Sequence, residues 1–291
     1  MASQFDVIVG FDCDGWSLPP DPGGRFVVAL KGVAADERRF EAGWARLLFG
    51  LWSTLEGKNS RSADRVFVTS EYSRRQAIEA YHLNPGSVRL APEGFDQDIV
   101  GTHPDESPLL RRNPSPIILS VARQYRRKDT ASLIRALPNL LAAIPDVRLR
   151  IIGDGPELAR TYRLTEQLGV LDSVSFLKSL CSVDTLRDEY SRASVFCLPS
   201  LQEGFGIVFL EAMSHGLPIV AVESGAVPEV APHGETSLLV PPRDPAALAH
   251  ALERILTDSD LAVRLGKAGT LRARRYDWPA AASAFIEGLN D

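Results

Sequence analysis

The sequence has few of the residues that stabilise small secreted or metal-bound proteins. Cysteine occurs only at Cys13, Cys181 and Cys197, and no two of these form a C-x-x-C pair. An odd number of widely spaced thiols argues against a disulfide framework, so we expect reduced cysteines in a cytoplasmic protein. The five histidines show no spacing typical of a metal cage. We therefore expect no bound metal.

Long apolar runs and an excess of positive charge are also missing. No stretch of eighteen apolar residues occurs, so no transmembrane helix is predicted. The N-terminus lacks the basic segment that begins a signal peptide. The formal net charge is −5 at pH 7, which argues against a general nucleic-acid binder. A length of 291 residues with 45% hydrophobic residues favours two globular domains of ordinary size.

Short β-branched segments recur along the chain, each followed by turn residues and a helical pattern. Their continuous apolarity is typical of parallel strands buried on both faces, and the alternation predicts a doubly wound α/β fold. The predicted strands are 5–9, 26–30, 66–69, 88–91, 117–122, 147–152, 174–177, 195–198, 218–222 and 237–240. The predicted helices are 41–55, 73–81, 129–143, 156–168, 183–192, 206–215 and 245–256.

A segment rich in proline and charge, 103–116, is the predicted domain linker. It leaves a first domain of residues 1–112, which is short for a doubly wound unit, and a second domain of residues 113–275. The helix 41–55 has Trp44, Leu51 and Trp52 on one apolar face. We interpret it as a core helix, with a membrane or partner surface over 41–57 as the alternative.

The segment SVARQYRRKD, Ser120–Asp129, concentrates positive charge behind a predicted strand. Ligands of open α/β sheets lie at the carboxyl ends of the strands, so this loop is a natural anion site. The alternative is a solvated surface loop. A second candidate, IIGDGPEL, fails the dinucleotide-binding pattern because Leu158 replaces its third glycine. We interpret it as a structural turn, with Pro156 at the first helical position.

The segment SLQEGFGIVFLEAMSHG, Ser200–Gly216, places the carboxylates Glu203 and Glu211 eight positions apart around a Gly-Phe-Gly turn. A helix beginning near Gly206 would point the N–H groups of 206–208 at a phosphate. Carboxylates accept hydrogen bonds from the hydroxyls of a ribose or a sugar. The alternative is an ordinary helix start with two favourable acids, and spacing alone favours neither. The segment SGAVPE, 224–229, can supply amides to the same crevice or form an ordinary turn.

Together these segments resemble the retaining nucleotide-sugar glycosyltransferases of the GT-B fold, specifically glycosyltransferase family 4 (glycosyl transferases group 1). The resemblance runs from about Ser60 to Trp278 and rests on the order and spacing of several motifs. They are SADRVFVTSEYSRRQAIEAYHLNPGSVRLAPEGFD, ILSVARQYRRKD, IIGDGPE and LPSLQEGFGIVFLEAMSHGLPIVAVESGAVPEV.

The resemblance implies two Rossmann-like domains facing a cleft, the first truncated and completed by a C-terminal helix over 276–291. It implies that Arg123 and Lys128 hold the donor diphosphate and stabilise the departing charge, while Glu203 holds the transferred sugar. The donor-binding residues that it implies are Gly204, Phe205, Gly206, Ile207, Val208, Glu211 at the ribose and Leu180 near the base. No metal and no general base in the donor half are needed, because the leaving phosphate takes the proton of the acceptor.

The sequence also departs from the family pattern. Ala122 replaces the glycine of V-G-R, and Lys178 stands where a glycine is common. Lys31 stands where the family often has a histidine, which makes it a candidate sugar contact. The chain begins about two βαβ units later than the family usually does, within the part that helps to bind donor and acceptor.

The leading hypothesis is a retaining glycosyltransferase that moves a sugar from a UDP-, GDP- or ADP-sugar to a hydroxyl of a glycan, a lipid-linked acceptor or a small molecule. The alternative is a nucleotide-sugar-binding pseudoenzyme or subunit that needs a partner chain for acceptor binding. A GT-B epimerase or phosphorylase is a third hypothesis, and no lysine motif for pyridoxal phosphate supports the phosphorylase. We expect a cytoplasmic protein, with 41–57 as a candidate contact to the inner face of a membrane.

Overall fold

A computed structural model describes residues 5–19, 23–96, 115–178 and 182–290. The chain folds into two compact units. The first contains Met1–Gly94, Glu203–Phe205 and Trp278–Asp291, and the second contains Phe95–Gln202 and Gly206–Asp277. The predicted linker 103–116 lies almost entirely outside the described residues.

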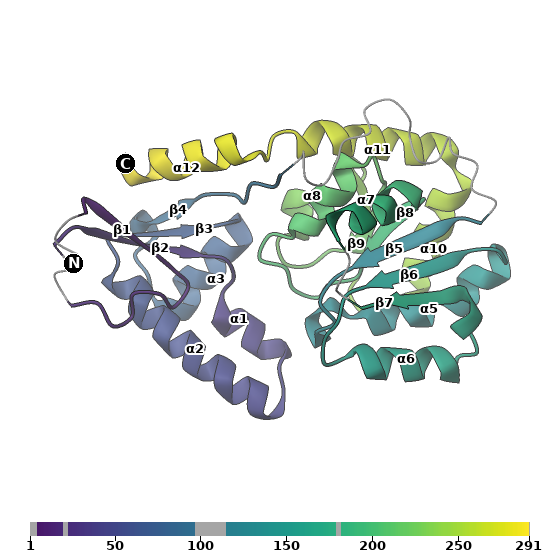
Figure 1. Ribbon diagram of the computed structural model, residues 1–291, viewed down its shortest axis with the longest axis horizontal. Coiled ribbons are helices and arrows are strands. Elements are labelled where there is room, and N and C mark those ends of the chain that lie inside the picture. Colours follow the sequence, from purple (N-terminus) through teal and green to yellow (C-terminus); the bar gives the residue numbers. More distant parts are fainter. Residues whose placement is uncertain (1–4, 20–22, 97–114, 179–181, 291) are drawn as a thin grey trace. The chain divides into compact units, whose positions relative to one another are not determined.

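The first unit is built on a four-stranded parallel sheet with the order β1-β2-β3-β4 (Figure 1). Its strands are β1 (Val7–Phe11), β2 (Arg25–Leu30), β3 (Arg65–Val68) and β4 (Val88–Leu90). Its helices are α1 (Ala34–Glu37), α2 (Gly43–Ser62), α3 (Glu71–Tyr81) and α12 (Trp278–Asn290), with the 3₁₀ turns η2 (Arg38–Phe40) and η3 (Pro85–Ser87).

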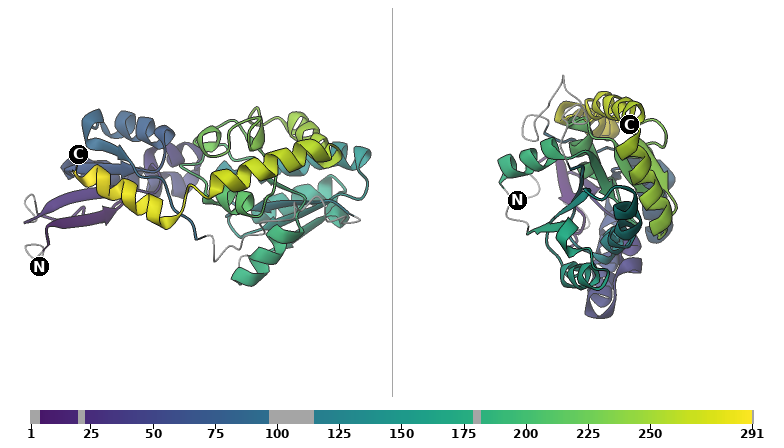
Figure 2. Two further views of the ribbon diagram at one scale, coloured as in Figure 1. Left: turned by 90° about the horizontal axis from the view of Figure 1, so that it is seen from above. Right: turned by 90° about the vertical axis from the view of Figure 1, so that its right-hand side faces the viewer.

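Alternate residues of these strands point to opposite faces of the sheet, as the period of a β-strand requires. Val28 and Val66 belong to one buried cluster, which also includes Ala77 of α3. Phe67 belongs to the other face, where its ring lies 4.1 Å from that of Phe285 in α12. The inner strands β2 and β3 are therefore covered on both faces, and Figure 2 shows α12 lying along one of these faces.

The second unit has a six-stranded parallel sheet with the order β10-β9-β8-β5-β6-β7. Its strands are β5 (Ile117–Val121), β6 (Arg148–Ile152), β7 (Val174–Leu177), β8 (Val195–Leu198), β9 (Ile219–Val222) and β10 (Ser237–Val240). Its helices are α5 (Thr130–Ala143), α6 (Leu158–Gln167), α7 (Val183–Arg192), α8 (Ile207–Ser214), α9 (Val227–Val230), α10 (Pro245–Thr257) and α11 (Ser259–Ala273), with η5 (Arg126–Lys128) and η6 (Leu171–Ser173).

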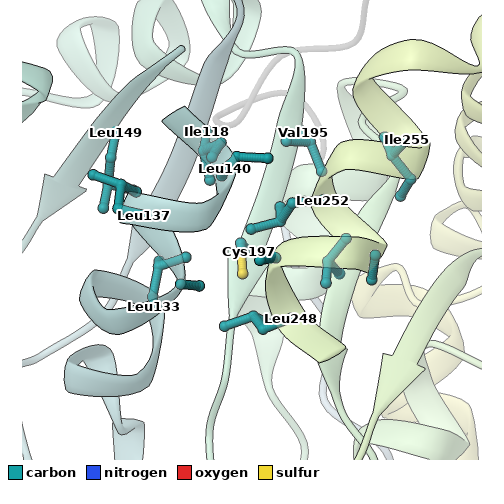
Figure 3. Packing of buried hydrophobic residues seen from close by; sticks show 14 of the residues in the cluster. Ile118, Leu133, Leu137, Leu140, Leu149, Val195, Cys197, Leu248, Leu252 and Ile255 are labelled. Carbon is teal, nitrogen blue, oxygen red and sulfur yellow. The ribbon is translucent and has the colours of Figure 1, made fainter. Parts of the chain in front are cut away.

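The strand β8 shows how the core of the second unit is divided. Val195 and Cys197 point into the cluster formed with α5 and α10, where Figure 3 shows Leu133 and Leu252 near the Cys197 sulfur. Phe196 points the other way and packs edge-on against Phe209 of α8, with 5.8 Å between ring centroids. Both faces are apolar, which explains why β8 reads as a continuous apolar segment in the sequence.

Every predicted strand and helix is found, and the sheets are parallel as expected. Two interpretations are wrong. The apolar half of α2 is not a core face, because Trp44 is 77% and Leu51 56% exposed, while the buried residues of α2 lie further along at Glu56–Ser60. Pro156 is not at the first helical position, because α6 begins at Leu158.

Candidate functional site

Three loops of the second unit meet where neighbouring parallel strands end. The Leu201 N–H, in the loop after β8, donates to the carbonyl oxygen of Arg127 in the loop after β5 at 2.7 Å. The Leu201 carbonyl accepts from the Ser224 hydroxyl, in the loop after β9, at 2.6 Å. The basic segment, the two-glutamate segment and SGAVPE are thus joined at one edge of the sheet, which is where α/β sheets bind ligands.

The basic loop is held in a defined conformation by its own side chains. The guanidinium groups of Arg123 and Arg127 lie 5.5 Å and 5.1 Å from the centroid of the Tyr125 ring, within cation–π range. Arg126 instead lies 3.5 Å from the Glu157 carboxylate. Lys128 is half-buried at the end of η5, directly before α5. In this loop Arg126 is therefore paired with a carboxylate, whereas Arg123 and Arg127 lie near an aromatic ring.

The GDGP turn has a structural function, as predicted. A Cβ on Gly153 would lie 2.0 Å from the Ala122 carbonyl oxygen, and one on Gly155 would lie 2.6 Å from that of Gln124. The Gln124 N–H donates to the Asp154 carbonyl at 2.9 Å. The turn thus packs its backbone against the start of the basic loop, an approach that only glycine permits.

The helix α8 begins where the sequence predicts, directly after Gly206. Gly206 is the N-cap residue and has a φ of 95°, a left-handed conformation that favours glycine. The amides at the start of an α-helix have no partner within the helix, and the helix dipole favours negative charge there. Ile207 and Val208 are therefore placed on a helix N-terminus that follows the loop after β8.

Glu211 is held by a side chain that the sequence analysis did not identify. Its Oε2 accepts a hydrogen bond of 2.7 Å from the hydroxyl of Tyr190 in α7, which is fully buried. The Tyr190 ring stacks on His215 with 5.0 Å between centroids, and His215 Nδ1 lies 3.0 Å from the Glu211 carbonyl oxygen. Burial raises the pKa of Glu211, while the bond from Tyr190 lowers it.

Residues Glu203–Phe205 belong to the first unit, although they lie between β8 and α8 in the sequence. The Gly204 carbonyl oxygen accepts from Thr69, Ser70 and Ser73 at 3.1, 2.6 and 3.0 Å. Glu203 and Phe205 are both buried. Three hydroxyl groups at the start of α3 therefore fix the backbone that carries Glu203.

Lys31, the residue in the expected place of a histidine, follows β2. Its Nζ forms a 2.9 Å ion pair with Glu93 and lies 5.5 Å from the centroid of the Phe11 ring. The side chain is nearly half exposed. Leu180, the predicted neighbour of the base, lies outside the described residues.

In the second unit, Arg123 and Lys128 lie in the loop at the sheet edge, and Ile207 and Glu211 lie on α8. Lys31 and Glu203 belong to the first unit. Sequence reasoning missed Tyr190, His215 and the three hydroxyl groups. The phenol of Tyr190 lies on the predicted helix 183–192, and only the tertiary fold brings it to Glu211. Ser70 had a local signal, because a serine directly before a helical pattern is typical of a helix N-cap. Its hydroxyl accepts from the Ser73 N–H in this way.

Within the described ranges, no cluster of three or more His, Cys, Asp or Glu side chains is arranged to hold a metal ion. No helix in the described part of the chain is both long and apolar enough to cross a membrane.

The chain has two Rossmann-like units with parallel sheets, and the second carries the basic loop and the helix α8 that begins after Gly206. These features define the GT-B class of glycosyltransferase folds. Residues 104–272 match the family model described as glycosyl transferases group 1. The chain belongs to this family.

The curated relatives agree with this assignment. A GDP-mannose-dependent alpha-(1-6)-phosphatidylinositol monomannoside mannosyltransferase of Mycolicibacterium smegmatis is 32% identical over 81% of this chain and 64% of its own length. A D-inositol 3-phosphate glycosyltransferase of Corynebacterium jeikeium is 30% identical over 77% of this chain and 56% of its own length. The chain therefore spans less than two thirds of the length of these relatives.

Among solved structures, a sucrose-phosphate synthase of Thermosynechococcus elongatus superposes with a TM-score of 0.80 at 28% sequence identity. The match covers 99% of this chain and 73% of the synthase chain. This likeness supports the fold given above for the described residues.

Proposed function

We propose that this protein is a retaining glycosyltransferase that moves a sugar from a nucleotide-diphosphate sugar to a hydroxyl of an acceptor. The observation that carries the proposal is the junction at Leu201, which joins the basic loop, the two-glutamate segment and the loop after β9 at one sheet edge. The family and the name of the GDP-mannose-dependent relative support transfer from a nucleotide sugar.

Each predicted site residue has a proposed role that suits its chemistry. Arg123 and Lys128 hold the diphosphate and stabilise the charge that develops on it as the glycosidic bond breaks. The amides at the start of α8 hold phosphate oxygens. Glu211, oriented by Tyr190, accepts hydrogen bonds from the ribose hydroxyls, and Glu203 positions the transferred sugar.

The reaction is balanced without a dedicated base. The bond from the anomeric carbon to the phosphate oxygen breaks, and its electron pair stays on that oxygen. The acceptor oxygen attacks the anomeric carbon from the same face, which retains the configuration. The acceptor proton passes to the leaving phosphate oxygen. We propose that cationic side chains, and no metal, stabilise the leaving group, so turnover should persist in EDTA.

The test measures binding and sugar release with UDP-, GDP- and ADP-sugars. Lys128→Ala and Arg123→Ala should lower turnover with little loss of stability, whereas Arg126→Ala is the control because Arg126 pairs with Glu157. Glu211→Ala should weaken donor binding. Nuclear magnetic resonance of the product reports whether the anomeric configuration is retained. Unchanged turnover in the Lys128 variant would contradict its role.

The second candidate is a donor-binding subunit that needs a partner chain for the acceptor. Donor binding without transfer to any acceptor would support this candidate, and absence of donor binding would exclude both. The exposed apolar face of α2, with Trp44, Leu47 and Leu51, keeps the prediction of a membrane or partner contact over 41–57 open.

A further inference from the structure

A cavity of about 680 Å³ in the first unit is not used by the donor chemistry described above. It opens at the carboxyl ends of β1 and β2, and the helix α2 forms its opposite wall. Its size lies within the range of small-molecule sites, about 300–1,000 Å³. The same edge of a parallel sheet carries the donor loops in the second unit, and this is where α/β domains bind their ligands.

The polar groups of the cavity are mainly carboxyl groups. Asp12, Asp14, Glu37 and Glu56 line it, and Lys31 is the one basic side chain among its described lining residues. Lys31 is already engaged by Glu93 in a 2.9 Å ion pair. Burial raises the pKa of Glu56 to about 7, so the negative potential of the cavity comes mainly from Asp12, Asp14 and Glu37, set against one paired ammonium.

Two of these carboxyl groups are fixed by hydrogen bonds from backbone N–H groups and from the Tyr81 hydroxyl. Asp12 Oδ1 accepts the Lys31 N–H at 2.8 Å. Glu56 Oε1 accepts from the Tyr81 hydroxyl at 2.7 Å and from the Ala34 N–H at 3.2 Å. Carboxylate oxygens have lone pairs beyond these bonds, and they accept readily from hydroxyl groups.

The remaining walls are aromatic. Phe49 and Trp52 of α2 meet edge to face, with 5.1 Å between ring centroids, and Trp16 and Phe11 also line the cavity. Rigid aromatic rings beside a few fixed polar groups are the usual lining of a site that binds a ring compound. Apolar C–H faces can pack on these rings while hydroxyl groups reach the carboxylates.

The cavity also lies close to the segment that carries Glu203. A Cβ on Gly204 would lie 3.3 Å from the Lys31 carbonyl oxygen and 3.7 Å from the Gly32 Cα. Lys31 and Gly32 line the cavity. Within the first unit, the residue next to Glu203 is therefore in contact with the cavity wall.

We propose that this cavity binds the acceptor and that the acceptor presents an uncharged, polyhydroxylated ring there, without a phosphate on that ring. This inference rests on the proposed function and names the substrate class for it. The carboxylates accept from ring hydroxyls, Trp52 and Phe49 pack against the ring, and a phosphate is repelled. The protein thus differs from its D-inositol 3-phosphate glycosyltransferase relative, whose named acceptor carries a phosphate.

Matched ring compounds test the proposal with the full 291-residue protein. Binding of inositol is compared with inositol 3-phosphate, and mannose with mannose 6-phosphate, by saturation-transfer magnetic resonance and calorimetry. Each uncharged ring should bind at least roughly tenfold more tightly than its phosphorylated form. The double variant Asp14→Asn, Glu37→Gln should narrow this ratio severalfold, whereas Asp188→Asn, on an exposed surface of α7, should leave it unchanged. Trp52→Ala should weaken binding of the uncharged rings.

Binding of a nucleotide sugar is measured in the same samples, so that two failures can be told apart. Equal or tighter binding of the phosphorylated rings overturns the proposal. Donor binding without binding of any ring also overturns it and leaves the proposed function standing. Loss of donor binding itself overturns the proposed function, and the acceptor assignment with it.

Discussion

At the scale of single residues, the contact between Tyr190 and Glu211 changes how the second glutamate is understood. A buried phenol donates to a carboxylate whose own burial raises its pKa. The bond from Tyr190 favours the charged form, which is the form that accepts hydrogen bonds from a diol. Tyr190 is therefore a positioning residue that orients Glu211 and favours its ionised form.

The variant Tyr190→Phe should raise the KM for the nucleotide sugar about tenfold, with a smaller change in kcat. Without the hydrogen bond from Tyr190 the pKa of Glu211 rises. The weakening of nucleotide-sugar binding at low pH should therefore begin at a higher pH in the variant. Steady-state kinetics from pH 5 to 8 measure both effects. Tyr162→Phe, on α6, is the control. An unshifted pH profile would contradict the assignment.

Glu56 allows a second prediction, on stability. Burial raises its pKa to about 7, so the folded protein holds a proton that the unfolded chain releases near its ordinary value of 4.5. The wild-type protein therefore loses stability as pH rises from 4.5 through 7. The free energy of unfolding of Glu56→Gln should exceed that of the wild type by ~1–3 kcal/mol at pH 8. The two values should become equal near pH 4.5.

Denaturant unfolding of both proteins at pH 5 and pH 8 measures this difference. Glu71→Gln provides the control, because the Glu71 side chain is nearly half exposed and lies 3.6 Å from Arg74. A variant that is less stable than the wild type at both pH values would show that the bonds from Tyr81 and Ala34 need a carboxyl group.

The sequence predicted local parts of the site better than its tertiary parts. Gly206 was identified because a glycine before a helical pattern is a local signal. The bonds from Tyr190 to Glu211 and from Ser70 to Gly204 join segments 21 and 134 residues apart. No local pattern encodes such pairs, because only the packing of separate elements creates them.

At the scale of elements, the period of the apolar residues predicted the strands well and one helix face badly. The strands β8 and β9 are apolar on both faces, so their burial follows from composition, whereas Val9 and Phe11 of β1 are apolar but exposed. The buried residues of α2 lie only at its C-terminal end, where Gly57 meets the Tyr81 ring of α3. The apolar half of the helix lies before this contact and is exposed. Periodicity reports that a face is apolar and does not report what covers it.

The helix α11 was not predicted, and its packing explains why its glycines are needed. A Cβ on Gly266 would lie 2.2 Å from the Gly216 carbonyl oxygen, just after α8. Gly266→Ala should therefore push α11 away and destabilise the second unit by ~2 kcal/mol, despite the better helix propensity of alanine.

Thermal and denaturant unfolding measure the effect of Gly266→Ala. Lys267→Ala is the matched control, because Lys267 is the exposed neighbour on the same helix. Unchanged or increased stability of the Gly266 variant would mean that α8 and α11 do not pack as closely as described.

At the scale of the whole molecule, the second unit has its own six-stranded sheet and core. We predict that a fragment of residues 95–277 unfolds cooperatively by itself and that UDP, GDP or ADP raises its Tm. The same fragment with Glu211→Ala should show a smaller rise. A fragment that is unfolded, or that no nucleotide stabilises, would contradict the placement of the donor residues in this unit.

The interleaving of the chain has a consequence for biosynthesis. The first unit contains residues that are synthesised before the second unit, yet it also needs α12, which is synthesised after that unit and whose Phe285 packs on Phe67. At about 5–20 residues per second, its sheet must wait on the order of ten seconds or more for that helix. All residues of the second unit are therefore synthesised before the last residues of the first unit. During that interval Phe67 lacks its partner ring and is open to chaperones.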